Sequence, residues 1–294
     1  MPDLLMKEVE ALMTMKLAEK VKVISAKPIG GGCINHAMKL DTNRGQYFLK
    51  WNSNCAPDLF VREAEGLNEL RKASEDCLKI PKVICVKEVD DSPGFLVQEY
   101  LQTGNNSGKT DEMLGRGLAN MHNYENSQFG FFETNYCGAT VQNNLWKKNW
   151  VDFFVENRLR FLVHLIEEKG LFSSGELKLF DKLFDKLPSL LPQKSKAVLI
   201  HGDLWSGNYM NTSEGPALID PAVYYADREM EFSILTMFGG FSNRFFQAYN
   251  EINPLEPDWQ ERNLLYQLYH ILNHYYLFGG TYGQQALSIS KRFI

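Results

Sequence analysis

The chain has 294 residues, 44% of them hydrophobic and 23% charged, a composition typical of a globular protein. Its length corresponds to about two domains of roughly 150 residues each. The net charge of −5 argues against nonspecific binding to nucleic acid or to an anionic membrane, because either partner requires a basic surface. No apolar run reaches the ~18 residues of a membrane-spanning helix. The N-terminal stretch also lacks the basic start and continuous apolar segment of a signal peptide.

The five cysteines are an odd number and include no CxxC pair. This pattern argues against a disulfide framework and against a zinc ribbon. Free thiols are typical of a reducing compartment, so we expect a cytoplasmic location.

The first part of the chain predicts a small sheet with helices. Leu5, Val9 and Leu12 recur at helical spacing and predict an amphipathic helix at the N terminus. A second helix is predicted over residues 57–73. Short runs rich in β-branched and aromatic residues, separated by turn signals, predict strands. The expected strands are residues 21–29, 34–42, 46–52, 82–86 and 94–100.

The second part of the chain is mostly helical. Residues 104–110 are polar and glycine-rich and are interpreted as a linker. They resemble a Walker A loop but have three residues instead of four between the glycines, so we expect no phosphate site there. The expected helices are residues 111–125, 145–170 and 174–187, with further helix from residue 229 to the end. The pattern predicts an α+β protein with a small β-rich lobe (residues 1–101) and a larger, mainly helical lobe (residues 102–294).

One β-rich segment interrupts the helical part and carries the clearest chemistry. The run HGDLWSGN (residues 201–208) follows an apolar strand, and Asp220 ends the next strand. Phosphoryl transfer needs one carboxylate to accept the proton of the attacking hydroxyl, and a second carboxylate with an amide oxygen to hold Mg²⁺ at the triphosphate. The step of five residues from Asp203 to Asn208 matches the catalytic loop of protein kinases, and Asp220 matches their downstream metal ligand. These three side chains predict a kinase, although any one alone could simply satisfy the backbone of a turn. His201 is expected to brace this turn by hydrogen bonds.

The small lobe offers the parts of an ATP site. Gly30, Gly31 and Gly32 lie between two expected strands, where backbone N–H groups can approach phosphates without a Cβ in the way. Lys50 ends a strand, from which its ammonium can reach the α- and β-phosphates. Taken singly, the glycines could be an ordinary turn and Lys50 a solvated edge residue. Their order along the chain favours nucleotide binding.

Two further features complete this predicted site. Glu63 and Glu65 lie on the following helix, and either could pair with Lys50. Glu63 is preferred because it lies on the apolar side of that helix. The expected adenine-binding hinge consists of Glu99, Tyr100 and Leu101.

Several motifs together resemble the fructosamine/ketosamine kinase family, within the group of aminoglycoside- and choline-kinase-like proteins. HGDLWSGN is followed by IDPAVYY and REMEF, and GGGCINHAMKL, FGFFETNYCG and WVDFFVENRLR agree elsewhere. The resemblance covers nearly the whole chain and implies a two-lobed protein-kinase-like fold. It implies Asp203 as the base, Asn208 and Asp220 as Mg²⁺ ligands, and Lys50 with Glu63 as the pair between the lobes.

The resemblance also implies a reaction. Family members use ATP and Mg²⁺ to phosphorylate the 3-hydroxyl of ketosamines, which are sugar adducts on free amines or on protein lysines. The phosphorylated adduct is unstable and is lost from the amine, so the implied process is deglycation, a form of protein repair.

The sequence departs from the family at two positions. Most members carry Asp or Ser where this chain has Cys33, which we interpret as a redox-sensitive thiol able to link a homodimer, or as an inert small side chain. Glu231 replaces a shorter acid. These changes concern sugar preference and regulation, because neither removes a predicted catalytic group.

The remaining candidates are less defined. Trp205 could stack on a sugar or plug the space under its loop, and Arg228 and Glu229 could hold the acceptor or pair with each other. His270 and His274 are four residues apart, as two metal ligands would be, but no third ligand lies nearby in the sequence, so packing or pocket lining is preferred. The candidate acceptor contacts are Trp205, Tyr225, Arg228 and Glu229.

Two alternative functions stay open at this point. One is a kinase for another small alcohol, such as an aminoglycoside or choline, and the other is a catalytically silent nucleotide-binding scaffold. The preferred sugar and the oligomeric state, monomer or Cys33-linked dimer, also stay open.

Overall fold

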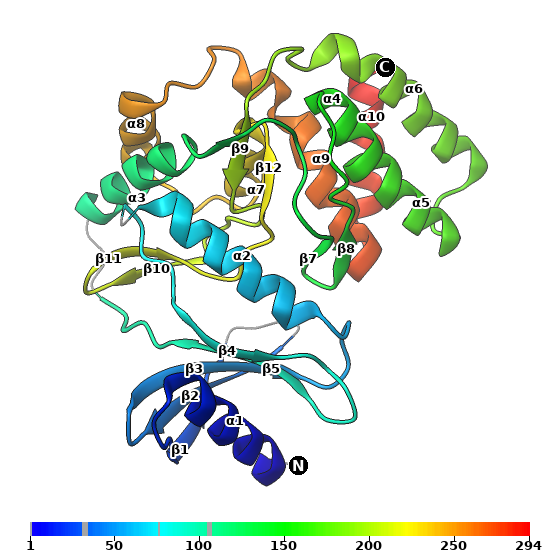
Figure 1. The fold of residues 1–294 in the computed structure, drawn as a ribbon. Coiled ribbons are helices and arrows are strands. Elements are labelled where there is room, and N and C mark those ends of the chain that lie inside the picture. The colour runs from blue at the N-terminus through cyan, green and yellow to red at the C-terminus, as the bar shows by residue number, and fades with distance from the viewer. Residues whose placement is uncertain (1, 31–34, 76, 105–107) are drawn as a thin grey trace.

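The structure is a computed structural model that describes residues 2–30, 35–75, 77–104 and 108–294. Its ribbon has two lobes, a smaller sheet-rich lobe that carries the N terminus and a larger helical lobe that carries the C terminus (Figure 1). This arrangement confirms the predicted fold class. The predicted phosphate-binding residues Gly31 and Gly32 and the predicted redox thiol Cys33 lie outside the described residues.

The small lobe is built on one antiparallel five-stranded sheet with the order β1-β2-β3-β5-β4. Helix α1 (Pro2–Leu17) packs on one face of this sheet, where Val9, Met13 and Leu49 form part of a separate small core. The strands are β1 (Val23–Pro28), β2 (His36–Thr42), β3 (Gly45–Asn52), β4 (Val83–Lys87) and β5 (Gly94–Glu99).

Strand alternation decides where Lys50 points. Successive side chains of a strand face opposite sides of its sheet. Leu49 on β3 is buried in the core under α1, so Lys50 projects from the other face, toward the large lobe. The same alternation brings Phe48 to the side of Lys50, and both side chains line the space between the lobes.

Helix α2 (Leu59–Ser74) lies between the sheet and the large lobe (Figure 1). Its buried residues Phe60, Ala64 and Leu67 belong to the same hydrophobic core as the interior of the large lobe. The helix is therefore held by large-lobe packing on one side, while Glu63 on another side faces Lys50.

The large lobe is mainly helical, as predicted, with short strands enclosed in it. Its helices are α3 (Gly108–Met121), α4 (Trp150–Phe153), the π-helical η1 (Phe154–Arg160), α5 (Phe161–Glu168), α6 (Ser174–Leu190), α7 (Glu229–Met237), α8 (Asn243–Ile252), α9 (Trp259–Phe278) and α10 (Tyr282–Phe293). In its three-stranded sheet, β9 (Ala197–Ile200) lies between β12 (Tyr224–Ala226) and β6 (Glu125–Asn126) and pairs with both. Two further pairs are β10 (Tyr209–Thr212) with β11 (Gly215–Leu218) and β7 (Asn135–Cys137) with β8 (Thr140–Gln142).

Three details differ from the expected elements. The predicted linker over residues 104–110 overlaps the start of α3, and the helix expected from residue 145 begins at Trp150 and contains a π-helical stretch. Strands β6, β7 and β8 were not expected, because two or three residues are too few to show alternation.

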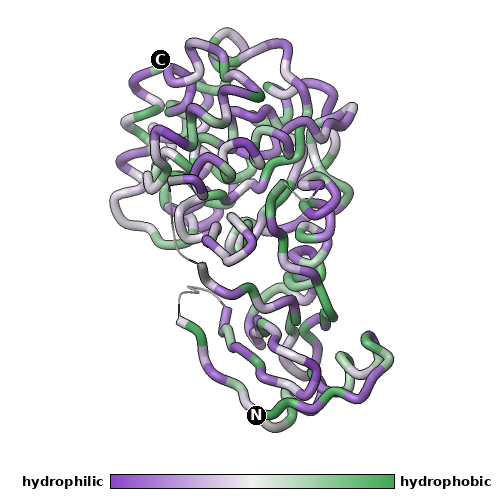
Figure 2. Tube along the Cα trace, turned by 90° about the vertical axis from the view of Figure 1, so that its left-hand side faces the viewer, coloured by the Kyte–Doolittle hydropathy of each residue, from purple (hydrophilic) through white to green (hydrophobic). Residues whose placement is uncertain are grey.

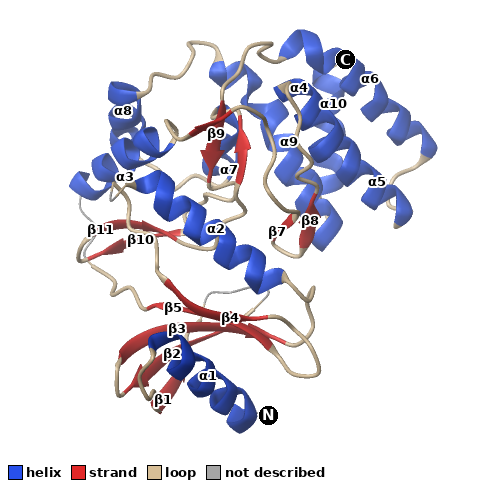
Figure 3. Ribbon diagram, viewed as in Figure 1, coloured by secondary structure: helices blue, strands red, loops and turns tan. Residues whose placement is uncertain are grey.

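Strands β9 and β12 lie among the helices of the large lobe, whereas β10 and β11 lie closer to the sheet of the small lobe (Figure 3). Hydrophobic and hydrophilic stretches alternate over short distances along the coloured parts of the trace (Figure 2). Among the described helices, none is both long enough and apolar enough to cross a membrane.

Candidate active site

A cleft of about 540 Å³ lies between the two lobes. This volume is in the range of small-molecule sites. Lys50 and the β5 end line it from the small lobe, and Asp203, Asn208 and Asp220 line it from the large lobe. The fold thus brings together residues that are up to 170 positions apart in the sequence.

Lys50 is held between two carboxylates in this cleft. Its Nζ lies 2.8 Å from Glu63 Oε1 and 2.6 Å from Asp220 Oδ1. Burial alone would lower the pKa of Lys50, but the two carboxylates outweigh burial and raise it, so the side chain stays charged. The alternative partner, Glu65, pairs with Arg62 instead, at 2.8 Å. The structure therefore shows the predicted pair of Lys50 with Glu63 and places a fixed positive charge in the cleft.

The turn of residues 201–208 depends on close backbone packing. Gly202 has a positive φ of 81°, and a Cβ at this position would lie 2.1 Å from the carbonyl oxygen of Ala222. Only glycine can occupy such a position. Asn208 closes the turn, because its Nδ2 donates to the Asp203 carbonyl oxygen at 2.8 Å and to Asp203 Oδ2 at 3.0 Å. The side chain of Asp203 is thereby oriented within the cleft.

The environment of Asp203 suits a general base. Burial raises the pKa of Asp203 from 3.8 to about 8, and the negative charges of Asp220 and Glu231 add to the rise, whereas the hydrogen bond from Asn208 opposes it. A base whose pKa lies near the working pH takes up a proton efficiently in the transition state. The raised pKa of Asp203 therefore fits proton abstraction from an alcohol.

A fully buried acid, Glu231, holds the start of the turn of residues 201–208. Glu231 accepts hydrogen bonds from the backbone N–H groups of His201, at 2.5 Å, and Gly202, at 3.1 Å. The ring of His201 donates from Nε2 to the Ile219 carbonyl oxygen at 2.9 Å and accepts from Asp203 N at Nδ1, at 3.3 Å. These bonds confirm that His201 braces the turn. They also show that the longer acid at position 231 is a structural partner of the loop.

The residues expected to hold Mg²⁺ have suitable donors. Asp220, in the left-handed region at φ 56°, and Asn208 both line the cleft beside Asp203. The Asn208 Nδ2 group is used by hydrogen bonds, and within the described part of the chain its Oδ1 accepts none. Carboxylate and amide oxygens are the ligands that a hard cation prefers. The donor set therefore fits Mg²⁺.

The expected hinge residues Glu99, Tyr100 and Leu101 lie at the end of β5 and just after it, and all three line the cleft. The backbone N–H of Glu99 donates to the Lys82 carbonyl oxygen at 2.8 Å, which ties the end of β5 to the residue before β4. Gly30, the first residue of the predicted glycine turn, also lines the cleft.

Trp205 is the one predicted acceptor residue that lines the cleft. Its side chain packs closely over Gly207, where a Cβ would lie 2.3 Å from the ring, and contacts Phe238 edge-to-face with centroids 6.1 Å apart. The ring of Phe238 in turn contacts His274, at 5.5 Å. Trp205 is 37% exposed, so it packs on its own loop and also lines the cleft.

The other three candidate acceptor residues require a correction, since none of them lines the cleft. Tyr225 is buried, and its hydroxyl donates to Glu69 at 3.0 Å. Arg228 donates to the side chain of Asn253 and to backbone carbonyls next to it. Glu229 is buried and pairs with Arg262 at 2.6 Å rather than with Arg228. Each has a structural partner away from the site.

Two sets of contacts near the turn were not predicted, although His270 by itself was expected to serve packing or pocket lining. A buried polar network under the turn links Asn135, Gln142, Asn144 and Tyr269, and the Arg158 guanidinium joins it by donating to Asn144 Oδ1 at 2.7 Å. Cys137 and His270 lie beside Asp203. No spacing in the sequence signals either set, because their members come from separate elements of the large lobe.

Comparison with known proteins agrees with this geometry. The sequence model described as fructosamine kinase matches residues 5–294. A probable ketoamine kinase from Synechocystis sp. is 37% identical over 275 residues, covering 92% of this chain and 90% of that protein. A chloroplastic protein-ribulosamine 3-kinase from Oryza sativa subsp. indica is 36% identical and covers 91% of this chain and 78% of its own length.

Solved structures give the same result. The crystal structure of a candidate fructosamine-3-kinase from Haemophilus somnus 129PT superposes with a TM-score of 0.86 at 25% identity, covering 97% of this chain and 96% of that chain. An aminoglycoside phosphotransferase, APH(4)-Ia, shares the fold with a TM-score of 0.65 at 15% identity, covering 97% of this chain and 98% of that chain. The whole-chain match, together with the kinase-type cleft, shows that this chain belongs to the fructosamine kinase family, whose members are phosphotransferases acting on a hydroxyl group.

Proposed function

We propose that this protein is an ATP-dependent kinase that phosphorylates the 3-hydroxyl of ketosamines. The observation that carries the proposal is the convergence of Asp203, Asn208, Asp220 and Lys50 on one cleft, with the base half-buried and its pKa raised. Family membership supports the acceptor class, because curated relatives are named ketoamine and ribulosamine kinases.

Each of these cleft residues has a separate role in phosphoryl transfer. Asp203 accepts a hydrogen bond from the acceptor hydroxyl and takes its proton as the new O–P bond forms. The bond between the γ-phosphorus and the β,γ-bridging oxygen breaks, and ADP leaves. Lys50 holds its ammonium toward the α- and β-phosphates, and hinge residues 99–101 hold the adenine. Such transfer depends mainly on positioning and on electrostatic stabilisation of the moving charge.

Asn208 and Asp220 would hold Mg²⁺. When bound there, the cation supplies charge neutralisation for the triphosphate. In the structure Asp220 contacts Lys50, so the same carboxylate that would hold the cation also lies beside the lysine that would bind the phosphates.

The acceptor side of the cleft favours a sugar over a polycation. An aminoglycoside carries several ammonium groups and requires unpaired carboxylates. Here Trp205 presents an aromatic face, next to Phe238 and His274, and Asp220 is already paired with Lys50. An aromatic face packs well against the apolar face of a sugar. This favours a ketosamine over the aminoglycoside alternative.

Deglycation as the biological outcome, the cytoplasmic location, and the choice between free and protein-bound substrate remain predictions of the proposed function. The redox role of Cys33 and a dimer linked through it also remain predictions.

The direct test is incubation of glycated lysine peptides with the full chain and MgATP. Ribulose-lysine and fructose-lysine peptides serve as acceptors, with an aminoglycoside as the competing class, and mass spectrometry follows the gain of one phosphoryl group. We expect phosphorylation of a ketosamine peptide and none of the aminoglycoside. Transfer only to the aminoglycoside would contradict the acceptor class, and no ATP consumption with any acceptor would support the silent scaffold.

A further inference from the structure

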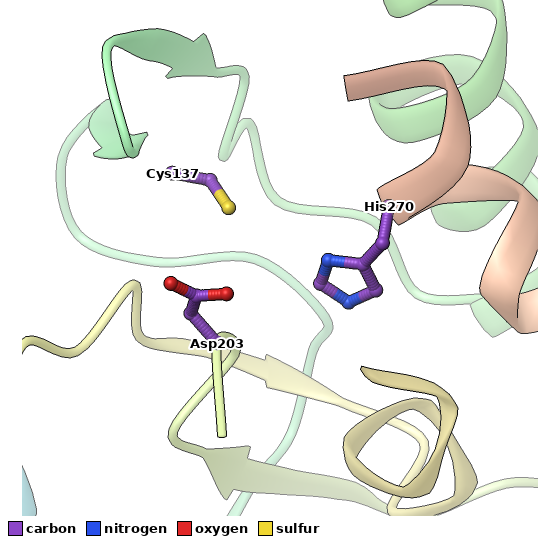
Figure 4. A group of neighbouring side chains, drawn as sticks. All are labelled: Cys137, Asp203 and His270. Carbon is purple, nitrogen blue, oxygen red and sulfur yellow. The ribbon is translucent and has the colours of Figure 1, made fainter. Parts of the chain in front are cut away.

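Two buried side chains, Cys137 and His270, lie next to the Asp203 carboxylate. Cys137 ends strand β7 and His270 lies within helix α9. The ligand atoms of Cys137, Asp203 and His270 all lie within 4.8 Å of one another, and the three side chains point toward a common space (Figure 4). Cys137 and His270 are almost fully buried, whereas Asp203 also lines the cleft. An ion could therefore reach this space from the cleft, past Asp203.

The histidine of this cluster has an unused donor atom. His270 is 1% exposed, and within the described chain its Nδ1 has no hydrogen-bond partner. In Figure 4 a ring nitrogen of His270 faces Cys137 and Asp203. Burial, with the nearby His274 and Arg158, lowers the pKa of His270 to about 3, so its imidazole is neutral, which is the form that binds metals. A buried polar atom without a partner is costly, and a cation would satisfy this one.

A thiol, an imidazole and a carboxylate form the donor set of a three-ligand zinc site. We propose that Cys137, Asp203 and His270 bind Zn²⁺, and that this binding inhibits the enzyme. Zinc–ligand bonds of about 2.0–2.3 Å place two ligands of one ion up to about 4 Å apart, so donors within 4.8 Å need to close by only about an ångström.

The binding step is not a redox reaction. Zn²⁺ exchanges water ligands for the three side chains, the Cys137 thiol releases its proton to solvent as the Zn–S bond forms, and the fourth position keeps a water. Mg²⁺ does not compete here, because a hard cation avoids sulfur and prefers the oxygen donors of Asn208 and Asp220. Zn²⁺ and Mg²⁺ therefore prefer different sites, which lie next to each other.

The inhibitory consequence rests on the proposed function. A carboxylate that ligates Zn²⁺ is much less basic and is held by the cation, so it is a poor acceptor for the proton of the hydroxyl. Asp203 is therefore removed from catalysis while the ATP side of the cleft stays intact.

The binding test uses Co²⁺ as a spectroscopic substitute for Zn²⁺ on the full chain. We expect a thiolate-to-cobalt charge-transfer band and tetrahedral d–d bands that Zn²⁺ abolishes at one equivalent. Cys137→Ser and His270→Asn should each weaken metal binding by at least about tenfold, and Cys137→Ser should also remove the charge-transfer band.

The matched control, Cys77→Ser, removes an exposed thiol and should change neither the metal affinity nor the charge-transfer band. Circular dichroism checks that each variant is folded. Absence of the band in the unaltered chain, or its persistence in Cys137→Ser, would overturn the site.

The inhibition test measures ketosamine phosphorylation at saturating MgATP, with free Zn²⁺ set by a metal buffer. We expect inhibition that a chelator reverses, and that needs at least about tenfold more free Zn²⁺ in Cys137→Ser, each protein being compared with its own zinc-free rate. Equal sensitivity of the two proteins would overturn the inhibitory role. Failure of the proposed function looks different, because it abolishes phosphorylation without zinc and leaves the cobalt spectrum unchanged.

Discussion

Two buried sets of paired charges in this protein have similar chemistry and different positions. Lys50 pairs with Glu63 and Asp220 at 2.8 and 2.6 Å, and Arg262 pairs with Glu229 through two hydrogen bonds of 2.9 and 2.6 Å. The side chains of both sets are mostly buried, yet only the Lys50 set lines the cleft. We infer that the Lys50 set serves ligand binding and the Arg262 pair serves stability. Burial and pairing alone do not distinguish a functional charge from a structural one, whereas position relative to the cleft does.

The largest expected effect lies at the cleft, at its proposed base. Asp203→Asn should lower kcat by about 10²–10⁴-fold, because the amide cannot accept a proton. ATP affinity should stay nearly unchanged, since Asp203 does not bind the nucleotide. Turnover assays and calorimetric ATP titration measure the two effects. The exposed Asp185→Asn serves as control, and a rate above about a tenth of the unaltered rate would contradict the role of Asp203.

The next effect tests the cleft ion pair itself. Lys50→Met should lower kcat/KM for ATP by about 10²–10³-fold, the usual cost of losing one preorganised partner of developing charge. Steady-state kinetics measure this loss. Lys72→Met, at an exposed lysine that also pairs with a glutamate, should leave the kinetics unchanged. If Lys50→Met kept normal kinetics, the cleft pair would be structural and the comparison would fail.

The Arg262 pair should show the opposite behaviour. Arg262→Met leaves Glu229 buried without its partner and should lower the free energy of unfolding by about 3–5 kcal/mol, while the folded fraction keeps a near-normal kcat. Denaturant unfolding and turnover at low temperature measure both quantities. Arg160→Met removes exposed ion pairs and should cost at most about 1 kcal/mol. A large loss of kcat in folded Arg262→Met would break the distinction.

The destabilisation by Arg262→Met should also depend on pH. Burial raises the pKa of Glu229 above its usual 4.5, and the hydrogen bonds from Arg262 oppose that rise. A carboxyl group with a raised pKa in the folded state contributes stability below its unfolded pKa and loses it as the pH rises through its folded pKa. Without Arg262 the folded pKa of Glu229 rises further, so the loss continues to higher pH. The contribution of Glu229 ionisation to the free energy of unfolding should be nearly equal in the unaltered protein and in Arg262→Met at about pH 4. The two proteins should differ increasingly in this contribution toward about pH 8. A difference that is constant with pH would contradict this origin.

The smallest effect concerns the acceptor side of the cleft. Trp205→Ala should raise KM for the ketosamine about three- to tenfold, the value of one aromatic contact, with little change in KM for ATP. Phe132→Ala, at an exposed aromatic residue that does not line the cleft, is the control. Equal KM values for the acceptor would assign Trp205 only to covering its own loop.

Much of the fold and part of the site could be predicted from the sequence, for identifiable reasons. The turn of residues 201–208 and Asp220 are local motifs, so their chemistry is readable in order along the chain. The position of Lys50 in its expected strand and the place of Glu63 on the apolar side of the next helix indicated this pair. These predictions depend only on local geometry.

The unpredicted features depend on packing between distant elements. Glu229 follows the catalytic segment closely in sequence, yet it opens α7 and faces Arg262 on α9, so nearness in sequence misled the acceptor prediction. His270 lacked a third ligand in the sequence, because Cys137 and Asp203 reach it only through folding. No periodicity or spacing carries that information.

The most direct test of the central claim is the position of the transferred phosphate. Fructose-lysine labelled with ¹³C in the sugar is incubated with MgATP and the unaltered chain, and NMR follows ³¹P–¹³C coupling in the product. The account predicts a phosphate on the oxygen of sugar carbon 3, formed by the unaltered chain and not by Asp203→Asn. A phosphate at another position, or equal product from both proteins, would contradict it.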